Sequence, residues 1–254
     1  MGTKTNIGWC DKTWNPWMGC HKVSQGCVNC YMFAEQKRYG HDPNVVRRSK
    51  TTFNAPLKWA ESAYVFTCSW SDWFVAEADE WRDEAWAIIK ATPHLTYQIL
   101  TKRPERIAAH LPADWGASGY PNVWLGTSTE RQAEADKRIP FLLQVPAALH
   151  FISAEPLLGP IDLWYYLPSR WAVVPKPSLD WVIVGGESGP NFRAMDVEWA
   201  GGIYAQCAAA GVAFFGKQAA AYANETPLLI EGRTIHQMPQ GHLDGEPGRE
   251  TNHV

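Results

Sequence analysis

The chain contains no hydrophobic run long enough to cross a membrane, and no signal peptide opens it. Six cysteines in 254 residues are far too few for a disulfide-stapled scaffold. A net charge of -3 at pH 7 gives no global attraction to nucleic acid. These absences predict a cytoplasmic protein with reduced thiols and no membrane anchor. Hydrophobic residues make up 46% of the chain, which is enough for a folded core and excludes a disordered protein.

Half of the cysteines lie close together near the start of the chain, at Cys20, Cys27 and Cys30. Their C-x6-C-x2-C spacing lacks the second Cys pair or the His pair that would complete a tetrahedral zinc site. One coordination position is then left for a ligand from outside the protein. A 4Fe-4S cluster held by three thiolates has such an open iron, which can bind S-adenosylmethionine and reduce its sulfonium. The spacing therefore predicts an iron-sulfur cluster loop, over residues 10–31.

Structural zinc is the alternative reading of the same cysteines. A closed zinc site needs a fourth protein ligand. The candidates for that ligand are Cys10, His21, Cys68 and Cys207. The iron-sulfur and zinc interpretations differ in whether one of these four residues is required for metal retention.

Short apolar runs alternate with helix-forming stretches along the chain, as expected for parallel βα units. The expected strands are Tyr64–Cys68, Thr96–Leu100, Asn122–Gly126, Leu149–Ser153, Trp181–Val184 and Val212–Phe215, with Asn6–Trp9 as a seventh candidate. The expected helices are Trp73–Ala91, Pro104–His110, Glu130–Leu143 and Val197–Ala210, the last ending at the C-cap residue Gly211. The pattern predicts an α/β fold, a partial TIM-like (β/α) barrel of six or seven parallel strands.

The barrel is predicted to be one domain over residues 1–235, with a polar tail at 236–254. Residues 162–178 contain Trp164-Tyr165-Tyr166 and three prolines, interrupt the βα rhythm, and are expected to form a lid-like insertion. Most of the tryptophans, which number 14, are expected to be packing residues.

Polar residues follow the predicted strands, where the functional groups of parallel βα barrels collect. Carboxylates at Glu155 and Glu187 are expected to meet the ammonium or ribose groups of a cofactor, and Lys102 or Arg103 and Lys217 its carboxylate or a phosphate. The pair Gly185-Gly186 would allow backbone N–H groups to approach that ligand, although tight βα turns also use glycine pairs. Each of these charges alone is equally compatible with a salt bridge at the rim. The predicted cofactor-binding residues are thus Glu155, Gly185, Gly186, Glu187, Lys102 and Lys217.

Several blocks of the sequence resemble phage-associated proteins of unknown function that carry a three-cysteine motif. These blocks are Thr13-Trp14-Asn15-Pro16, Gly19-Cys20, Gly26-Cys27, Cys30-Tyr31, Leu100–Arg106, Asn122–Gly126, Ser153–Ile161, Asp180–Pro190 and Gly211–Gln218. That family is often encoded beside a three-Cys-motif partner protein, and it looks like a relative of radical S-adenosylmethionine enzymes. The resemblance implies a partial βα barrel with an N-terminal cluster loop.

Two features depart from the wider radical superfamily, whose usual cysteine spacing is C-x3-C-x2-C and whose Gly-Gly-Glu segment usually follows the second strand. In this sequence the interval is longer, and Gly185-Gly186-Glu187 follows a late strand. Residue roles are therefore not transferred from that superfamily.

The predicted function is reductive cleavage of S-adenosylmethionine to a 5′-deoxyadenosyl radical, with an electron donor as partner. A nucleotide or nucleic-acid base is the expected substrate class, because Arg47-Arg48-Ser49-Lys50 forms a local basic stretch near Tyr39, Phe53 and Trp59, although a solvated helix face also explains it. The first alternative is a non-enzymatic zinc or iron-sulfur module that recognises a protein or nucleic-acid partner. The second is a metal-free hydrolase that uses Glu155 and Glu187 as acid and base.

Overall fold

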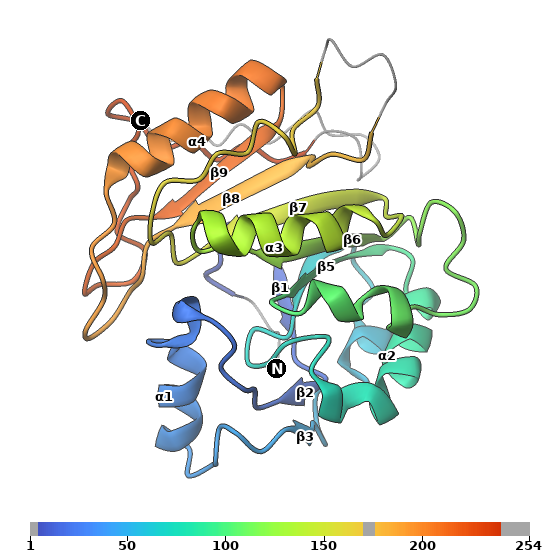
Figure 1. Ribbon diagram of the computed structural model, residues 1–254. Coiled ribbons are helices and arrows are strands. Elements are labelled where there is room, and N and C mark those ends of the chain that lie inside the picture. Colours follow the sequence, from blue (N-terminus) through green and yellow to red (C-terminus); the bar gives the residue numbers. More distant parts are fainter. Residues whose placement is uncertain (1–4, 170–175, 240–254) are drawn as a thin grey trace. The chain divides into compact units, whose positions relative to one another are not determined.

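The computed structural model describes residues 5–169 and 176–239 of the chain (Figure 1). Contacts between Cα atoms divide the chain into two units. The first comprises Met1–Thr127 with Val145–Ala148, and the second comprises Ser128–Gln144 with Leu149–Val254. The sequence-based boundary of one domain at residue 235 stays a prediction.

The first unit is built on four parallel strands in the order β1-β4-β5-β6. They are β1 (Lys12–Trp14), β4 (Ala63–Thr67), β5 (Leu95–Thr101) and β6 (Val123–Ser128). Nearly all residues of β5 and β6 are buried, which is typical of parallel strands covered on both faces. Burial on both faces also explains the continuous apolar runs that predict β4, β5 and β6 in the sequence.

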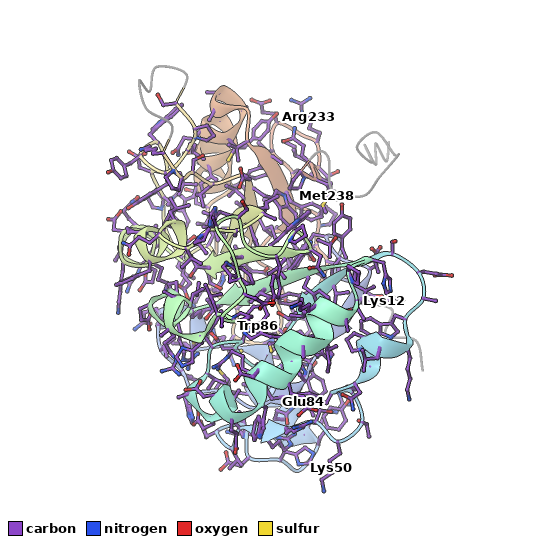
Figure 2. The ribbon with its side chains drawn as sticks, turned by 90° about the vertical axis from the view of Figure 1, so that its right-hand side faces the viewer. Lys12, Lys50, Glu84, Trp86, Arg233 and Met238 are labelled. Carbon is purple, nitrogen blue, oxygen red and sulfur yellow. The ribbon has the colours of Figure 1, made fainter. Side chains whose placement is uncertain are left out.

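Helix α2 (Asp79–Ala91) belongs to this unit (Figure 1), and Figure 2 labels its Trp86. The buried residues of the helix include Ala85, Trp86 and Ile89. The indole of Trp86 meets that of Trp73 with ring centroids 5.2 Å apart, and Trp73 meets Trp14 of β1 at 5.6 Å. This chain of aromatic contacts connects the helix to the strand. The prediction that most tryptophans are packing residues is confirmed for these three.

The first unit also contains elements that the sequence did not predict. The short helix α1 (Tyr31–Arg38) directly follows Cys30, and β2 (Trp17–Met18) pairs antiparallel with β3 (Arg47–Arg48). The 3-10 turns η1 (Gln25–Cys27) and η2 (Ala55–Lys58) are also unpredicted. Three further 3-10 turns lie where helices were predicted, namely η3 (Ala76–Ala78) within Trp73–Ala91, and η4 (Pro104–Arg106) and η5 (Ala108–His110) within Pro104–His110.

The second unit has three parallel strands in the order β7-β8-β9, accompanied by two helices (Figure 1). The strands are β7 (Leu149–Ala154), β8 (Trp181–Gly185) and β9 (Ala213–Gln218), and the helices are α3 (Gln132–Leu143) and α4 (Val197–Ala210). The bounds of α4 are those predicted. Gly211 caps its C-terminus in the left-handed conformation, with φ of 73°.

The predicted fold class is confirmed, as an α/β protein with the seven parallel strands and flanking helices of a partial β/α barrel. Within the described part of the chain, no helix combines the length and apolarity needed to cross a membrane.

Two predicted elements are wrong. Gly8 and Trp9 form a turn, and the seventh strand is Lys12–Trp14, whose register is set by pairing with Val65–Thr67. The predicted helix Pro104–His110 consists of the two 3-10 turns η4 and η5. The strand error arises because pairing with β4 selects the register, while residues 104–110 form i→i+3 backbone hydrogen bonds, such as that of the Ile107 amide to the Pro104 carbonyl, in place of α-helical ones.

The two irregular segments are described only in part. In the predicted insertion, Tyr166 and Leu167 are buried, and residues 170–175 lie outside the described range. In the predicted tail, His236 stacks on Phe215 and the amide of Gln237 donates to the Phe214 carbonyl at 2.9 Å. Packing on β9 therefore continues past residue 235, and residues 240–254 lie outside the description.

Candidate functional site

The segment that leads from β1 to the first cysteine is anchored by its own side chains. Trp14 is buried, and its indole N–H donates to the Thr52 carbonyl at 3.0 Å. The Asn15 side chain donates to Ser69 Oγ at 2.9 Å and accepts from the Trp70 amide at 2.9 Å. The Trp14-Asn15 motif therefore joins the loop after β1 to the loop after β4.

Gly19 brings the backbone into position for Cys20. Its φ is +96°, and a Cβ at this residue would lie 2.3 Å from the Val45 carbonyl oxygen. The Gly19 carbonyl accepts from Ser71 Oγ at 2.6 Å, while the Cys20 amide donates to the Pro43 carbonyl at 2.9 Å. Only glycine satisfies both the dihedral angle and the close approach, which accounts for the Gly-Cys pair.

The three thiols of the predicted cluster loop lie in one electrostatic neighbourhood. Cys27 ends the turn η1, Cys30 is the N-cap residue of α1, and the charge of Cys27 acts on the pKa of both Cys20 and Cys30. Burial raises the pKa of the Cys20 thiol to about 12, and burial also raises the pKa of Cys30. In the absence of a metal, the Cys20 and Cys30 thiols are protonated at neutral pH.

Cations from the end of β5 oppose this effect of burial. Arg103 Nη1 donates to Cys20 Sγ at 3.8 Å and lowers its pKa, while the charge of Lys102 lowers that of Cys30. The backbone amides of Met32 and Phe33 at the start of α1 act on Cys30 in the same direction. These contacts offset the effect of burial in part, and the pKa of both thiols stays raised.

Within the described residues, no group of three or more His, Cys, Asp and Glu side chains has the arrangement that holds a metal ion. The fit to iron or zinc therefore depends on the chemistry of the donors, which are three buried or half-buried thiols with two nearby cations. Thiolates are the ligands that iron-sulfur clusters and zinc select. The metal site stays a prediction.

The four candidates for a further protein ligand differ in their surroundings. His21 forms an ion pair with Glu77, Cys10 lies just before β1, and Cys207 lies in α4 of the second unit. Cys68 is buried directly after β4 with φ of 55°, and its pKa is raised by burial and by the charge of Asp72. The charge of Cys20 also acts on the pKa of Cys68.

Asp72 and Arg103 are a pair that the predicted site did not include as a unit. The Asp72 carboxylate accepts from the Phe74 amide (2.9 Å), the Thr101 hydroxyl (2.6 Å), the Lys102 amide (2.8 Å) and Arg103 Nη1 (3.0 Å). Both side chains are buried. The signal available in the sequence was an Asp after one predicted strand and an Arg after the next.

In the second unit, the predicted cofactor residues Glu155 and Lys217 form an ion pair with each other. A Cβ at Gly185 would lie 3.3 Å from the carboxyl carbon of Glu155. The absence of a side chain at Gly185 therefore makes room for this ion pair.

Glu187 is buried and bound by Arg193, whose Nε donates to Oε2 at 3.0 Å and whose amide donates at 2.8 Å. A Cβ at Gly186 would lie 2.2 Å from the Ala220 amide nitrogen. Close packing of two backbone segments thus explains Gly186 without a ligand. Each of the two predicted carboxylates thus has a cation partner.

The basic segment is held by contacts within the first unit. Arg48 forms an ion pair with Glu84 and stacks on Phe53, with its guanidinium carbon 3.7 Å from the ring centroid. Arg47 donates to the side chain of Gln36. Both arginines therefore have structural roles, and Lys50 is the exposed cation of the stretch.

Comparison with known proteins finds one family over almost the whole chain. The family, described as "Protein of unknown function (DUF5131)", matches residues 4–250. No curated protein and no solved structure matches the chain.

Proposed function

This chain belongs to the DUF5131 family of proteins of unknown function, and we propose that it is an iron-sulfur enzyme of the radical S-adenosylmethionine type. Cys20, Cys27 and Cys30 would hold a 4Fe-4S cluster. The observation that carries the proposal is a cysteine loop after β1, with buried or half-buried thiols, that has Arg103 in contact with Cys20 and Lys102 acting on Cys30. Parallel βα proteins place their chemistry at this end of their strands.

A cluster held by Cys20, Cys27 and Cys30 would supply the open coordination position for S-adenosylmethionine and, with an electron donor, the electron for its reductive cleavage. The chain's own residues would stabilise the bound charge. Arg103 and Lys102 offset the negative charge of the thiolates. Cys27 is buried in this loop, whereas Cys20 and Cys30 are partly exposed.

The charged residues after the strands of the second unit are proposed to bind charged groups of a cofactor. Lys217 would bind a carboxylate and Glu155 an ammonium or ribose hydroxyl, each exchanging its present partner for the ligand. Glu187 would need to release Arg193 in the same way. Gly185 and Gly186 would act indirectly, because they allow the packing that places these side chains.

The remaining parts of the proposal concern location and partners. We place the protein in the cytoplasm, where a reducing environment keeps the thiols free. The proposed partners are an electron donor, a nucleotide or nucleic-acid substrate, and the three-Cys-motif partner protein.

Anaerobic reconstitution with iron and sulfide, followed by dithionite and S-adenosylmethionine, tests this proposal. We expect about four irons per chain and formation of 5′-deoxyadenosine, with both lost in Cys27→Ala. Cys10→Ser is the matched control and should keep both. Zinc in place of iron, with no cleavage of the cofactor, would contradict the proposal.

A zinc-binding recognition module is the second candidate, and the position of Cys68 favours it. Cys68 is buried just after β4 and the charge of Cys20 acts on its pKa, so it is the proposed fourth thiolate of a closed zinc site. For this function, Cys68→Ala should abolish zinc retention. For the radical function, the same variant should keep its cluster.

A further inference from the structure

Arg103 connects the end of β5 to the cysteine loop through its guanidinium group. Nη2 donates to the His21 carbonyl at 3.0 Å, and Nη1 donates to Cys20 Sγ at 3.8 Å. Nη1 also lies 3.0 Å from Asp72 Oδ2. One side chain thus contacts the backbone and the sulfur of the same loop, together with a carboxylate from a different loop.

Asp72 determines the orientation of this guanidinium. Its carboxylate receives donors from Phe74, Thr101 and Lys102 in addition to Arg103, and these donors fix both of its oxygens. The Thr101 hydroxyl also accepts from the Arg103 amide at 2.9 Å. A carboxylate that is bound on several sides cannot rotate, so the Arg103 fork has one favourable direction.

The planar fork of arginine is needed for this set of contacts. Arg103 uses two separate nitrogens to contact the His21 carbonyl, the Cys20 sulfur and Asp72. Lysine has a single charged nitrogen and cannot make all three contacts at once. Arg103 is also 8% exposed, so its hydrogen bonds are shielded from water. Its three contacts therefore hold the loop more firmly than a surface ion pair would.

We propose that Arg103, oriented by Asp72, is the positioning residue that clamps the Cys20-His21 segment and raises the reduction potential of a cluster bound to Cys20. A donor on a ligating sulfur stabilises the added negative charge of the reduced cluster, and hydrogen bonds to sulfur are known to tune such potentials. The tuning role rests on the proposed function, whereas the clamping role holds for the metal-free chain.

The clamping role is tested by amide hydrogen exchange of metal-free protein over residues 17–24. Loss of the guanidinium in Arg103→Gln should accelerate exchange of this segment by about tenfold or more, since hydrogen bonds to charged groups are lost. Arg103→Lys and Asp72→Asn should show intermediate acceleration. The control is Arg106→Gln, because Arg106 binds Asp79 and the Phe74 carbonyl and does not contact the cysteine loop.

The tuning role is tested by redox titration of reconstituted protein followed by electron paramagnetic resonance. Arg103→Gln should lower the midpoint potential, Arg103→Lys should lower it less, and Arg106→Gln should leave it unchanged. Circular dichroism identifies any variant that fails to fold, in which case Arg103→Lys and Asp72→Asn provide the comparison.

The outcomes separate this inference from the proposed function. Wild-type protein without iron or cofactor cleavage contradicts the proposed function and with it the tuning role, while the exchange experiment still decides the clamping role. Unchanged exchange over residues 17–24 in Arg103→Gln overturns the clamp. A wild-type midpoint potential in that variant overturns the tuning.

Discussion

At the scale of single residues, Asp79 shows how one carboxylate holds several elements of the first unit. Its carboxylate lies 2.6 Å from Arg82 Nη1 of α2, 2.7 Å from Arg106 Nη2 of η4 and 3.2 Å from His110 Nε2 of η5. Partial burial acts to raise the pKa of Asp79, but hydrogen bonds and charge from Arg82 and Arg106 outweigh it and lower the pKa to about 2.

The lowered pKa of Asp79 predicts a loss of stability in acid. Its contribution is complete above the unfolded value of 3.8 and disappears as the pH falls through about 2. The stability difference between wild type and Asp79→Asn should therefore be constant near neutral pH and shrink below pH 3.8. The effect should be modest, since the side chain is 42% exposed. Urea unfolding between about pH 5 and about pH 2.5 measures it, and a pH-independent difference would contradict the assignment.

Gly186 provides a second prediction at this scale. A methyl group at this position meets the Ala220 backbone at 2.2 Å, so Gly186→Ala should destabilise the protein by about 1–3 kcal/mol. Gly202 of α4 is the matched control, because a Cβ there meets no atom within 4 Å. Gly202→Ala should stabilise the protein by about 0.5–1 kcal/mol in the same denaturant titration. Equal effects of the two substitutions would show that the close approach at Gly186 is absent.

At the scale of elements, α4 begins and ends at residues with defined capping roles. The Asp196 carboxylate accepts from the Glu198 amide at 2.9 Å at its start, and Gly211 ends the helix in the left-handed conformation. The helix also buries Ile203 and Cys207 in the second unit. Its stability thus depends on local capping as well as on packing.

Removal of the N-cap predicts a measurable loss. Asp196→Ala should lower the free energy of unfolding by about 1 kcal/mol, because the Glu198 amide loses its acceptor. Asp196→Asn should retain most of the stability, since asparagine is an equally good N-cap residue. Thermal unfolding followed by circular dichroism compares the two variants. A loss of the same size in both would assign the effect to the charge of Asp196 and not to its hydrogen bond.

At the scale of the whole molecule, binding of a metal to buried thiols is coupled to folding. Metal ligation offsets the cost of forming thiolates at the buried Cys20 and Cys30 sulfurs, and a ligand that binds only the folded state raises the unfolding temperature. Reconstituted wild-type protein should therefore melt several degrees above the metal-free form. Cys27→Ala should lose this increase, and Cys10→Ser should keep it. Calorimetry of the loaded and metal-free forms provides the measurement, and an equal increase in all three proteins would place the metal elsewhere.

The family match also belongs to this scale, because it extends over residues 4–250 and so includes both units. The family match therefore covers the chain from the cysteine loop to the segment after β9. Both units carry charged residues after their strands, with Arg103 and Asp72 in the first and Glu155 and Lys217 in the second.

The sequence by itself determined the fold class and most elements, because both follow from local patterns. Continuous apolar runs predicted the buried strands, and Gly211 marked the end of α4. The spacing of Cys20, Cys27 and Cys30 likewise indicated one thiol loop, since residues so close in the chain cannot lie far apart in space.

The tertiary structure decided what those local patterns leave open. The position of β1 at Lys12–Trp14 depends on pairing with β4, and the contact of Arg103 with Cys20 joins residues that are 83 positions apart. The ion pairs of Glu155 with Lys217 and of Glu187 with Arg193 likewise follow from which loops meet. Such pairings depend on distances between segments that are remote in sequence, and composition and periodicity do not encode these distances.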